Sequence, residues 1–404
     1  MSMRWGRAAT AAAAAIAGAL VALTVTGPAA SAATTAEQLA GARYVALGDS
    51  FVSGYGLPPY AASPAPGCLQ SSDSIAHRVA STYGLSLTDV SCTGATIANV
   101  TSTPQAVPGA TVPAQLDAVT ADTALVTVSI GGNDAGFSTV LASCAALGPS
   151  GPLLQDPASP SCAVKFGSQL AAAVDGLAPG LDAMLAAIHR KAPNAKVIVL
   201  GYPALAPTDA ATPAGGCFSS ALGTGQPPLP RNAFPFTDAD RPLIASLSAR
   251  LDAAQRASAD RNGATFVSVL ADSDAHTPCT GTTGPYLNGI SLTSLQPPTL
   301  AEGAMHPNAA GASFLAARLQ QAVGEAFPAT GVQPGRAGTS DPPAPSPTVQ
   351  PAAVDGPTTR LAESGSEITT LLITGGALAG IGALLVLTRR TRPLGRRSAA
   401  PAPK

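Results

Sequence analysis

The stretch YVALGDS, residues 44–50, is an apolar run that ends in a glycine followed by two polar residues. Comparable apolar runs occupy residues 125–130, 197–200 and 265–269. Nearly continuous apolar strands are typical of a parallel sheet that is covered on both faces. Because ligands bind at the carboxyl ends of such strands, Ser50 is a candidate site residue from its position alone.

Segments with helical periodicity separate these runs. Apolar residues recur at helical spacing over 168–189, 237–262 and 308–327, although Pro179 predicts a break or kink in the first segment. Alternating strands and helices predict an α/β fold. We expect a three-layer α/β/α sandwich with a mostly parallel central sheet, formed by a single domain over residues 35–327.

The first 32 residues predict a secretory signal peptide. Arg4 and Arg7 precede an apolar, alanine-rich run over 8–25, and the small residues ASA follow at 30–32. A basic start, an apolar middle and a small-residue cleavage site are the features of such a signal. An uncleaved membrane anchor is the alternative.

The other end of the chain has the features of a membrane anchor on a stalk. Residues 328–366 are rich in proline and predict an extended linker. The uncharged apolar run 368–387 is long enough to cross about 30 Å of hydrocarbon as a transmembrane helix. Five arginines follow it, so the basic tail 388–404 is expected to stay in the cytoplasm.

Charge and cysteine content narrow the possible partners. The part between the two ends holds 14 basic residues and all 23 acidic residues, which argues against nucleic acid as a partner. Six cysteines behind an export signal predict three disulfides with 15 possible connectivities. Metal binding is the alternative, but no closely spaced C-x-x-C pair supports it.

Three short motifs carry residues that suit acyl transfer. Ser50 in GDS is a nucleophile if a base removes its proton. Asn133, in GGND at 131–134, and Gly94, in CTGAT at 92–96, offer N–H groups to a developing oxyanion. Each motif alone is equally compatible with an ordinary turn.

The base must be one of four histidines. His77 and His189 lie within helical stripes, which favours a structural or solvent-facing role. His276 lies in a loop beside a cysteine. We prefer His306, because it immediately precedes the last helix, where a base can be held in a fixed position.

Taken together, these residues resemble the SGNH/GDSL hydrolase family over residues 43–319. The matching blocks are GDSF at 48–51 with SG at 53–54, Gly94, GGND at 131–134 and HP at 306–307. The resemblance implies that Ser50 is the nucleophile and His306 the base. It also implies an oxyanion hole formed by Ser50, Gly94 and Asn133, and no metal or organic cofactor.

The six cysteines are similar to those of the disulfide-rich actinobacterial lipase branch of that family. In that branch the bridges join neighbours in sequence. The resemblance therefore implies the pairs Cys68–Cys92, Cys144–Cys162 and Cys217–Cys279.

One position departs from the family pattern. The family usually has an aspartate three residues before the histidine, and here that position is Gly303, with Glu302 one place away. We therefore expect a Ser50–His306 dyad in which the Gly303 carbonyl orients the imidazole. Glu302 is the less favoured helper.

The segment LAESG at 361–365 resembles a sortase signal of the Leu-Ala-x-Thr-Gly kind, with serine in place of threonine. Sorting would join the chain to the cell wall. A plain membrane anchor is the alternative.

The leading expectation is a secreted, surface-anchored, monomeric serine esterase or lipase, with acyl lipids favoured as substrates. Two alternatives stay open: a carbohydrate O-acetyl esterase, and a non-catalytic surface protein that binds a partner on the same fold.

Overall fold

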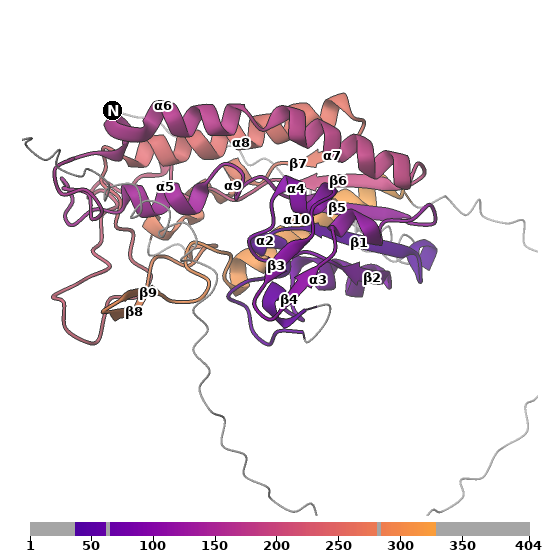
Figure 1. The fold of residues 1–404 in the computed structure, drawn as a ribbon, viewed down its shortest axis with the longest axis horizontal. Helices are drawn as coiled ribbons and strands as arrows, with labels where there is room; N and C mark the ends of the chain where they lie inside the picture. Colours follow the sequence, from indigo (N-terminus) through magenta and orange to yellow (C-terminus); the bar gives the residue numbers. More distant parts are fainter. Residues whose placement is uncertain (1–36, 62–64, 281–283, 329–404) are drawn as a thin grey trace, which may run out of the picture.

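The structure, a computed structural model, describes residues 37–61, 65–280 and 284–328 (Figure 1). The predicted signal peptide 1–32, the transmembrane helix 368–387 and the basic tail 388–404 lie outside the described residues. The linker 328–366 with its LAESG motif also lies outside them, apart from its first residue. These four assignments stay predictions.

A five-stranded parallel sheet with the order β2-β1-β5-β6-β7 forms the centre of the molecule. Its strands are β1 (Arg43–Gly48), β2 (Ser86–Asp89), β5 (Leu125–Ser129), β6 (Lys196–Leu200) and β7 (Thr265–Val267). The four predicted apolar runs correspond to β1, β5, β6 and β7. The sequence analysis missed β2, an edge strand in which three of four residues are polar and none is fully buried. Two small antiparallel hairpins lie outside the sheet: β3 (Gln105–Val107) with β4 (Ala110–Val112), and β8 (Leu292–Leu295) with β9 (Pro298–Leu300).

Helices cover both faces of the sheet, which confirms the predicted three-layer sandwich (Figure 1). One core contains Tyr44 and Ala46 of β1 and packs against α3 (Ile75–Tyr83) and α10 (Ala309–Ala326). The other core contains Val45 and Leu47 and packs against the short helix α4 (Ile97–Thr101) and against long helices. The long helices on this side are α6 (Cys162–Asp175), α7 (Ala178–Lys191) and α8 (Arg241–Arg261). Further short helices are α2 (Ser50–Ser53), α5 (Phe137–Cys144) and α9 (Leu270–Ser273).

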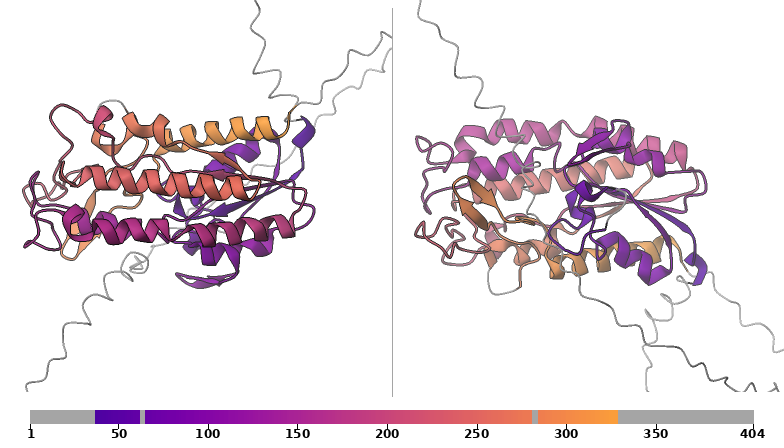
Figure 2. Two further views of the ribbon diagram at one scale, coloured as in Figure 1. Left: turned by 90° about the horizontal axis from the view of Figure 1, so that it is seen from above. Right: turned by 60° about the horizontal axis from the view of Figure 1, so that its bottom comes forward.

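The helix boundaries follow proline and capping chemistry. The expected break in the first helical segment occurs at residues 176–177, and Pro179 lies in the first turn of α7, where a missing N–H is tolerated. Asn308 caps α10 by accepting a hydrogen bond from the Gly311 amide at 3.0 Å. Within the described residues, the stretch Cys162–Lys191 alone is long and apolar enough to span a membrane. It packs alongside α8 (Figure 2, left), as a core helix of the domain does.

Three disulfides tie loops to this core: Cys68–Cys92, Cys144–Cys162 and Cys217–Cys279. They are the pairs that the family resemblance implies. The first holds the loop that follows β2, two residues before Gly94. The same loop also donates from the Thr93 amide to the Cys68 carbonyl at 3.1 Å. This bridge therefore restrains a segment of the candidate site.

Candidate active site

Ser50 is the first residue of the short helix α2, directly after the carboxyl end of β1. Gly48 makes this turn possible: its φ is +146°, and a Cβ there would lie 2.6 Å from the Ser129 carbonyl oxygen. Asp49 caps α2, since its Oδ1 accepts from the Phe51 amide at 3.0 Å. The turn thus places the Ser50 hydroxyl at the strand end where the sequence predicted it.

His306 reaches Ser50 from the turn that precedes α10. Its Nε2 lies 2.7 Å from the Ser50 Oγ, although 256 residues separate the two in sequence. The rings of Phe51 and Tyr55 pack against the imidazole with centroid distances of 4.9 and 5.0 Å. The expected nucleophile and base are therefore within hydrogen-bond distance of each other.

The Ala304 carbonyl orients the imidazole, because it lies 2.8 Å from the His306 Nδ1. A carbonyl only accepts, so Nδ1 carries the hydrogen and Nε2 is free to accept the serine proton. The expectation of a backbone carbonyl in this role is correct in kind but wrong in residue. The Gly303 carbonyl instead accepts from the His306 amide at 3.0 Å and from the Asn288 side chain at 3.1 Å.

Glu302 does not contact the histidine ring. Its side chain is exposed and accepts a hydrogen bond from the Tyr60 hydroxyl. The second candidate for orienting His306 is therefore also wrong. The backbone turn at Gly303, with φ +74°, brings the next carbonyl rather than a side chain to the ring.

Burial lowers the pKa of His306 to about 4, and the hydrogen bond to the Ala304 carbonyl opposes this shift. Among the described residues, no carboxylate is in contact with the ring to favour the charged form. The imidazole is therefore neutral at pH 7, which is the state that can accept a proton from the serine.

The three expected oxyanion donors follow three adjacent strands, β1, β5 and β2. Asn133 uses one amide hydrogen to bind the Ala95 carbonyl at 2.8 Å and retains the other. Gly94 has φ +81°, a conformation in which a side chain would be strained. The amides of Ser50 and Gly94 have no acceptor among the described residues.

Hydrogen bonds connect the loops that carry these donors. The Cys92 amide donates to the Gly48 carbonyl at 3.0 Å, and the Ser53 hydroxyl lies 3.3 Å from that of Thr93. The Asp134 carboxylate accepts from the Ile97 amide at 3.0 and 3.2 Å. The loops are thus held to one another independently of the Ser50 and His306 side chains.

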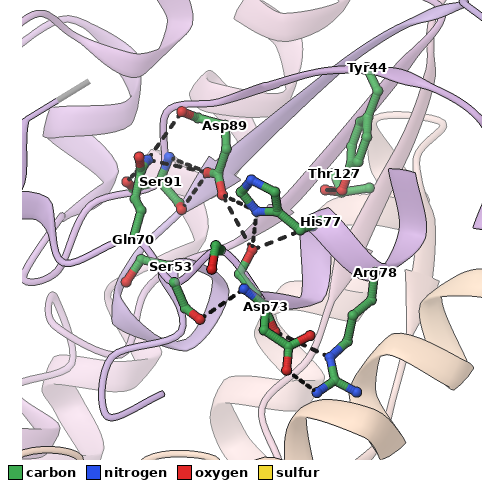
Figure 3. Close-up of polar contacts among 12 residues, drawn as sticks. Tyr44, Ser53, Gln70, Asp73, His77, Arg78, Asp89, Ser91 and Thr127 are labelled. Carbon is green, nitrogen blue, oxygen red and sulfur yellow. Dashed lines mark hydrogen bonds and ion pairs between the residues drawn. The ribbon is translucent and has the colours of Figure 1, made fainter. Parts of the chain in front are cut away.

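The other three histidines lie away from Ser50, as expected. His77 is on α3, where its Nδ1 faces Ser74 and the buried Asp89 (Figure 3). His189 is in the last turn of α7. His276 stacks on Tyr286 with centroids 4.1 Å apart.

The sequence analysis missed Tyr202, which follows the carboxyl end of β6 at the same edge of the sheet. Its hydroxyl donates to Asp49 Oδ2 at 2.5 Å and accepts from the Gly132 amide at 3.2 Å. Its position after a strand was the only available signal. Over the residues that the structure describes, no group of three or more His, Cys, Asp or Glu side chains is arranged to hold a metal ion.

Comparison with known proteins gives a consistent result. The GDSL-like Lipase/Acylhydrolase family matches residues 46–314 of the chain. Lipase 2 of Streptomyces coelicolor is 35% identical over 268 residues, which cover 65% of this chain and 82% of that protein. An esterase of Streptomyces scabiei is 31% identical over 260 residues, covering 59% of this chain and 72% of that protein.

Two crystal structures share the fold. The extracellular lipase of Streptomyces rimosus is 27% identical, with a TM-score of 0.52 over 70% of this chain and 100% of that one. The phospholipase A1 of Streptomyces albidoflavus is 26% identical, with a TM-score of 0.51 over 70% of this chain and 99% of that one.

Proposed function

Because this chain belongs to the GDSL-like lipase/acylhydrolase family and is a carboxylic ester hydrolase, we propose that it cleaves acyl esters through Ser50 and His306. The observation that carries the proposal is the 2.7 Å contact between the Ser50 Oγ and the His306 Nε2. The opposite ring nitrogen is already occupied by a backbone carbonyl, which fixes the tautomer that the reaction needs.

The reaction proceeds in two halves. His306 Nε2 takes the hydroxyl proton as the Ser50 Oγ attacks the ester carbonyl carbon. The resulting oxyanion accepts hydrogen bonds from the amides of Ser50 and Gly94 and from the Asn133 side chain. The tetrahedral intermediate then expels the alkoxide, which takes the proton from Nε2. A water molecule repeats these steps on the acyl-enzyme and releases the carboxylic acid.

We favour an acyl lipid as the substrate. The similar proteins from Streptomyces include lipases and a phospholipase A1, and the cysteine pairing is the one that the lipase branch implies. Nothing in the described residues specifically favours a carbohydrate O-acetyl ester. The proximity of Ser50 to His306 argues against a protein that only binds a partner.

We further propose that the enzyme acts outside the cell. Three disulfides are compatible with an oxidising compartment, and the similar lipase of Streptomyces rimosus is extracellular. Anchoring by the apolar run 368–387 or by the LAESG motif belongs to this proposal. Mass spectrometry of the mature C-terminus separates the two: a chain that retains residues 371–387 contradicts sorting to the cell wall.

A fluorophosphonate probe tests the nucleophile directly. The probe should label the wild-type protein at neutral pH, and Ser50→Ala should abolish labelling. Ser74→Ala is the matched control, because Ser74 also contacts a histidine but lies at a helix cap. Absence of labelling in the folded wild-type protein would refute the assignment of Ser50.

Substrate class needs a second assay. The panel contains p-nitrophenyl esters of graded chain length, a phospholipid and an acetylated sugar. We expect hydrolysis of the acyl lipids and longer esters. Activity confined to the acetylated sugar would contradict the lipid proposal while leaving the catalytic mechanism intact.

A further inference from the structure

The Tyr202 hydroxyl connects loops that follow two different strands. Tyr202 itself follows β6, yet its hydroxyl donates to Asp49 beyond β1 and accepts from the Gly132 amide beyond β5. Gly132 also lies close to the tyrosine ring, since a Cβ there would meet Tyr202 atoms at 3.4–3.5 Å. One side chain therefore bridges the loop that holds the nucleophile and the loop that holds Asn133.

The bridge is buried, and its carboxyl group is unfavourable for stability. Asp49 is 1% exposed and Tyr202 is 5% exposed. Burial raises the pKa of Asp49 to about 7, since removal from water disfavours the carboxylate. Both carboxyl oxygens have donors, namely the Phe51 amide and the Tyr202 hydroxyl. A buried carboxyl group that is fully hydrogen-bonded fixes geometry at a cost in folding free energy.

We propose that Tyr202 and Asp49 are positioning residues that align the oxyanion hole with the nucleophile. A continuous chain of hydrogen bonds runs from the Phe51 amide in α2 through Asp49 and Tyr202 to the Gly132 amide. Gly132 precedes Asn133, so the chain sets the distance between the Asn133 amide and Ser50. This inference rests on the proposed function, because it assigns a role to residues around the same serine.

The physical reason is the separate origin of the donors. The Ser50 amide and the Asn133 side chain come from loops after different strands, and sub-ångström errors in such a constellation reduce the rate strongly. The Tyr202 hydroxyl donates one hydrogen bond and accepts another. Each of these hydrogen bonds polarises the hydroxyl and thereby strengthens the other. Removing it leaves a buried amide and a buried carboxyl oxygen without their partner.

Tyr202→Phe is the first test, measured with a short-chain p-nitrophenyl ester. We expect kcat to fall by about tenfold to a hundredfold while KM stays within about twofold, because the ground state binds without the full oxyanion alignment. Tyr44→Phe is the matched control. Tyr44 is also buried, and its hydroxyl bonds Thr127 at 2.7 Å, which joins β1 to β5 within the sheet. It should lower the melting temperature and leave kcat unchanged.

A double-mutant cycle with Asn133→Ala tests the route of the effect. If Tyr202 acts by positioning Asn133, adding Tyr202→Phe to Asn133→Ala lowers kcat by less than about threefold. Full multiplication of the two effects, or equal losses of kcat in Tyr202→Phe and Tyr44→Phe, would overturn the proposal. An unchanged kcat in Tyr202→Phe would also overturn it. Failure of the proposed function is a separate result, because it shows in the labelling of Ser50→Ala.

Discussion

The part of the chain that the structure describes contains two serine–histidine pairs, and they differ in the group that accompanies the histidine. At the start of α3, the cap residue Ser74 lies 2.9 Å from the His77 Nδ1. The same nitrogen faces the buried carboxylate of Asp89 (Figure 3). The second pair is Ser50, after β1, and His306, whose ring is held by a backbone carbonyl and, among the described residues, contacts no carboxylate. By residue type, the first set is the complete Ser/His/Asp triad.

The geometry of the two sets shows that residue type alone is misleading. A single ring nitrogen of His77, Nδ1, faces both the Ser74 Oγ at 2.9 Å and the Asp89 Oδ2 at 3.8 Å. A proton relay needs the two partners on opposite nitrogens of the ring, as His306 has them. Ser74 also accepts from the His77 amide, as the N-cap of α3. The first set is therefore a helix cap on a buried carboxylate.

The surroundings of the two histidines explain the difference. The Asp89 carboxylate accepts from the Ser91 amide at 3.0 Å and the Ser91 hydroxyl at 2.6 Å (Figure 3). Its hydrogen bonds thus tie the end of β2 to the loop that follows it. At His306 the ring is held by packing against Phe51 and Tyr55 and by the carbonyl of Ala304, which the turn directs toward it. Orientation of a catalytic histidine needs an acceptor at the right place, and here the backbone supplies it.

Replacement of each histidine by alanine is the strongest test of this comparison. His306→Ala should lower kcat/KM by about 10⁴-fold or more, because it removes the only base that reaches Ser50 in the described structure. His77→Ala should keep kcat/KM within about threefold and lower the melting temperature, since it perturbs a cap. Steady-state kinetics and thermal unfolding of both variants decide it. Comparable activity losses would show that the α3 set is functional.

The second test concerns Asn133, the proposed side-chain donor to the oxyanion. Asn133→Ala should lower kcat by about 10²–10³-fold with little change in KM, as loss of one donor does in other acyl-transfer enzymes. Asn262→Ala is the control: its side chain bonds Asp182 and Ser258 at the end of α8, far from the site. A loss carried mainly by KM would contradict the oxyanion role of Asn133.

The fold was predictable where burial dominates the sequence. The apolar runs of β1, β5, β6 and β7 predict a sheet that is covered on both faces. Ser86–Asp89 does not, because three of its four residues are polar and none of the four is fully buried. Its membership depends on backbone pairing with β1, which leaves no hydrophobic period in the sequence.

The candidate site was predictable where a sequence motif marks the residue. Ser50, Gly94, Asn133 and His306 occur in ordered motifs. The Ala304 carbonyl has no such signature, because every residue has a carbonyl and only the turn decides which one meets the ring. Tyr202 reaches Asp49 and Gly132 through the strand order β1-β5-β6, and that order is a property of the folded sheet.

The pH dependence of kcat/KM tests whether the pKa of His306 is lowered, as expected for a buried ring without a carboxylate partner. Because burial lowers the imidazole pKa to about 4, the ring stays neutral down to that pH. Activity should fall about tenfold per pH unit only below pH 4, as the base becomes protonated. The profile is also recorded for Asp49→Asn, because burial raises the pKa of Asp49 to about 7. Titration of Asp49 could otherwise add an acid limb at a higher pH than that of His306. An acid limb near 6.5 that persists in Asp49→Asn would contradict the lowered pKa of His306.

The smallest effect is expected from the acid nearest to His306 in sequence. Glu302→Ala should leave kcat/KM within about threefold, because an exposed carboxylate that binds a tyrosine hydroxyl contributes little to the charge on the ring. The same hydroxyl accepts from the Gly56 amide at 2.8 Å, and Gly56 packs against Gly303, so a slight loss of stability is expected instead. Asp89→Asn is the matched carboxylate change beside the other histidine. It should also spare kcat/KM but lower the melting temperature more, because Asp89 is buried and multiply bonded. A loss of several hundredfold in Glu302→Ala would restore a carboxylate to the catalytic set and make the two histidines alike.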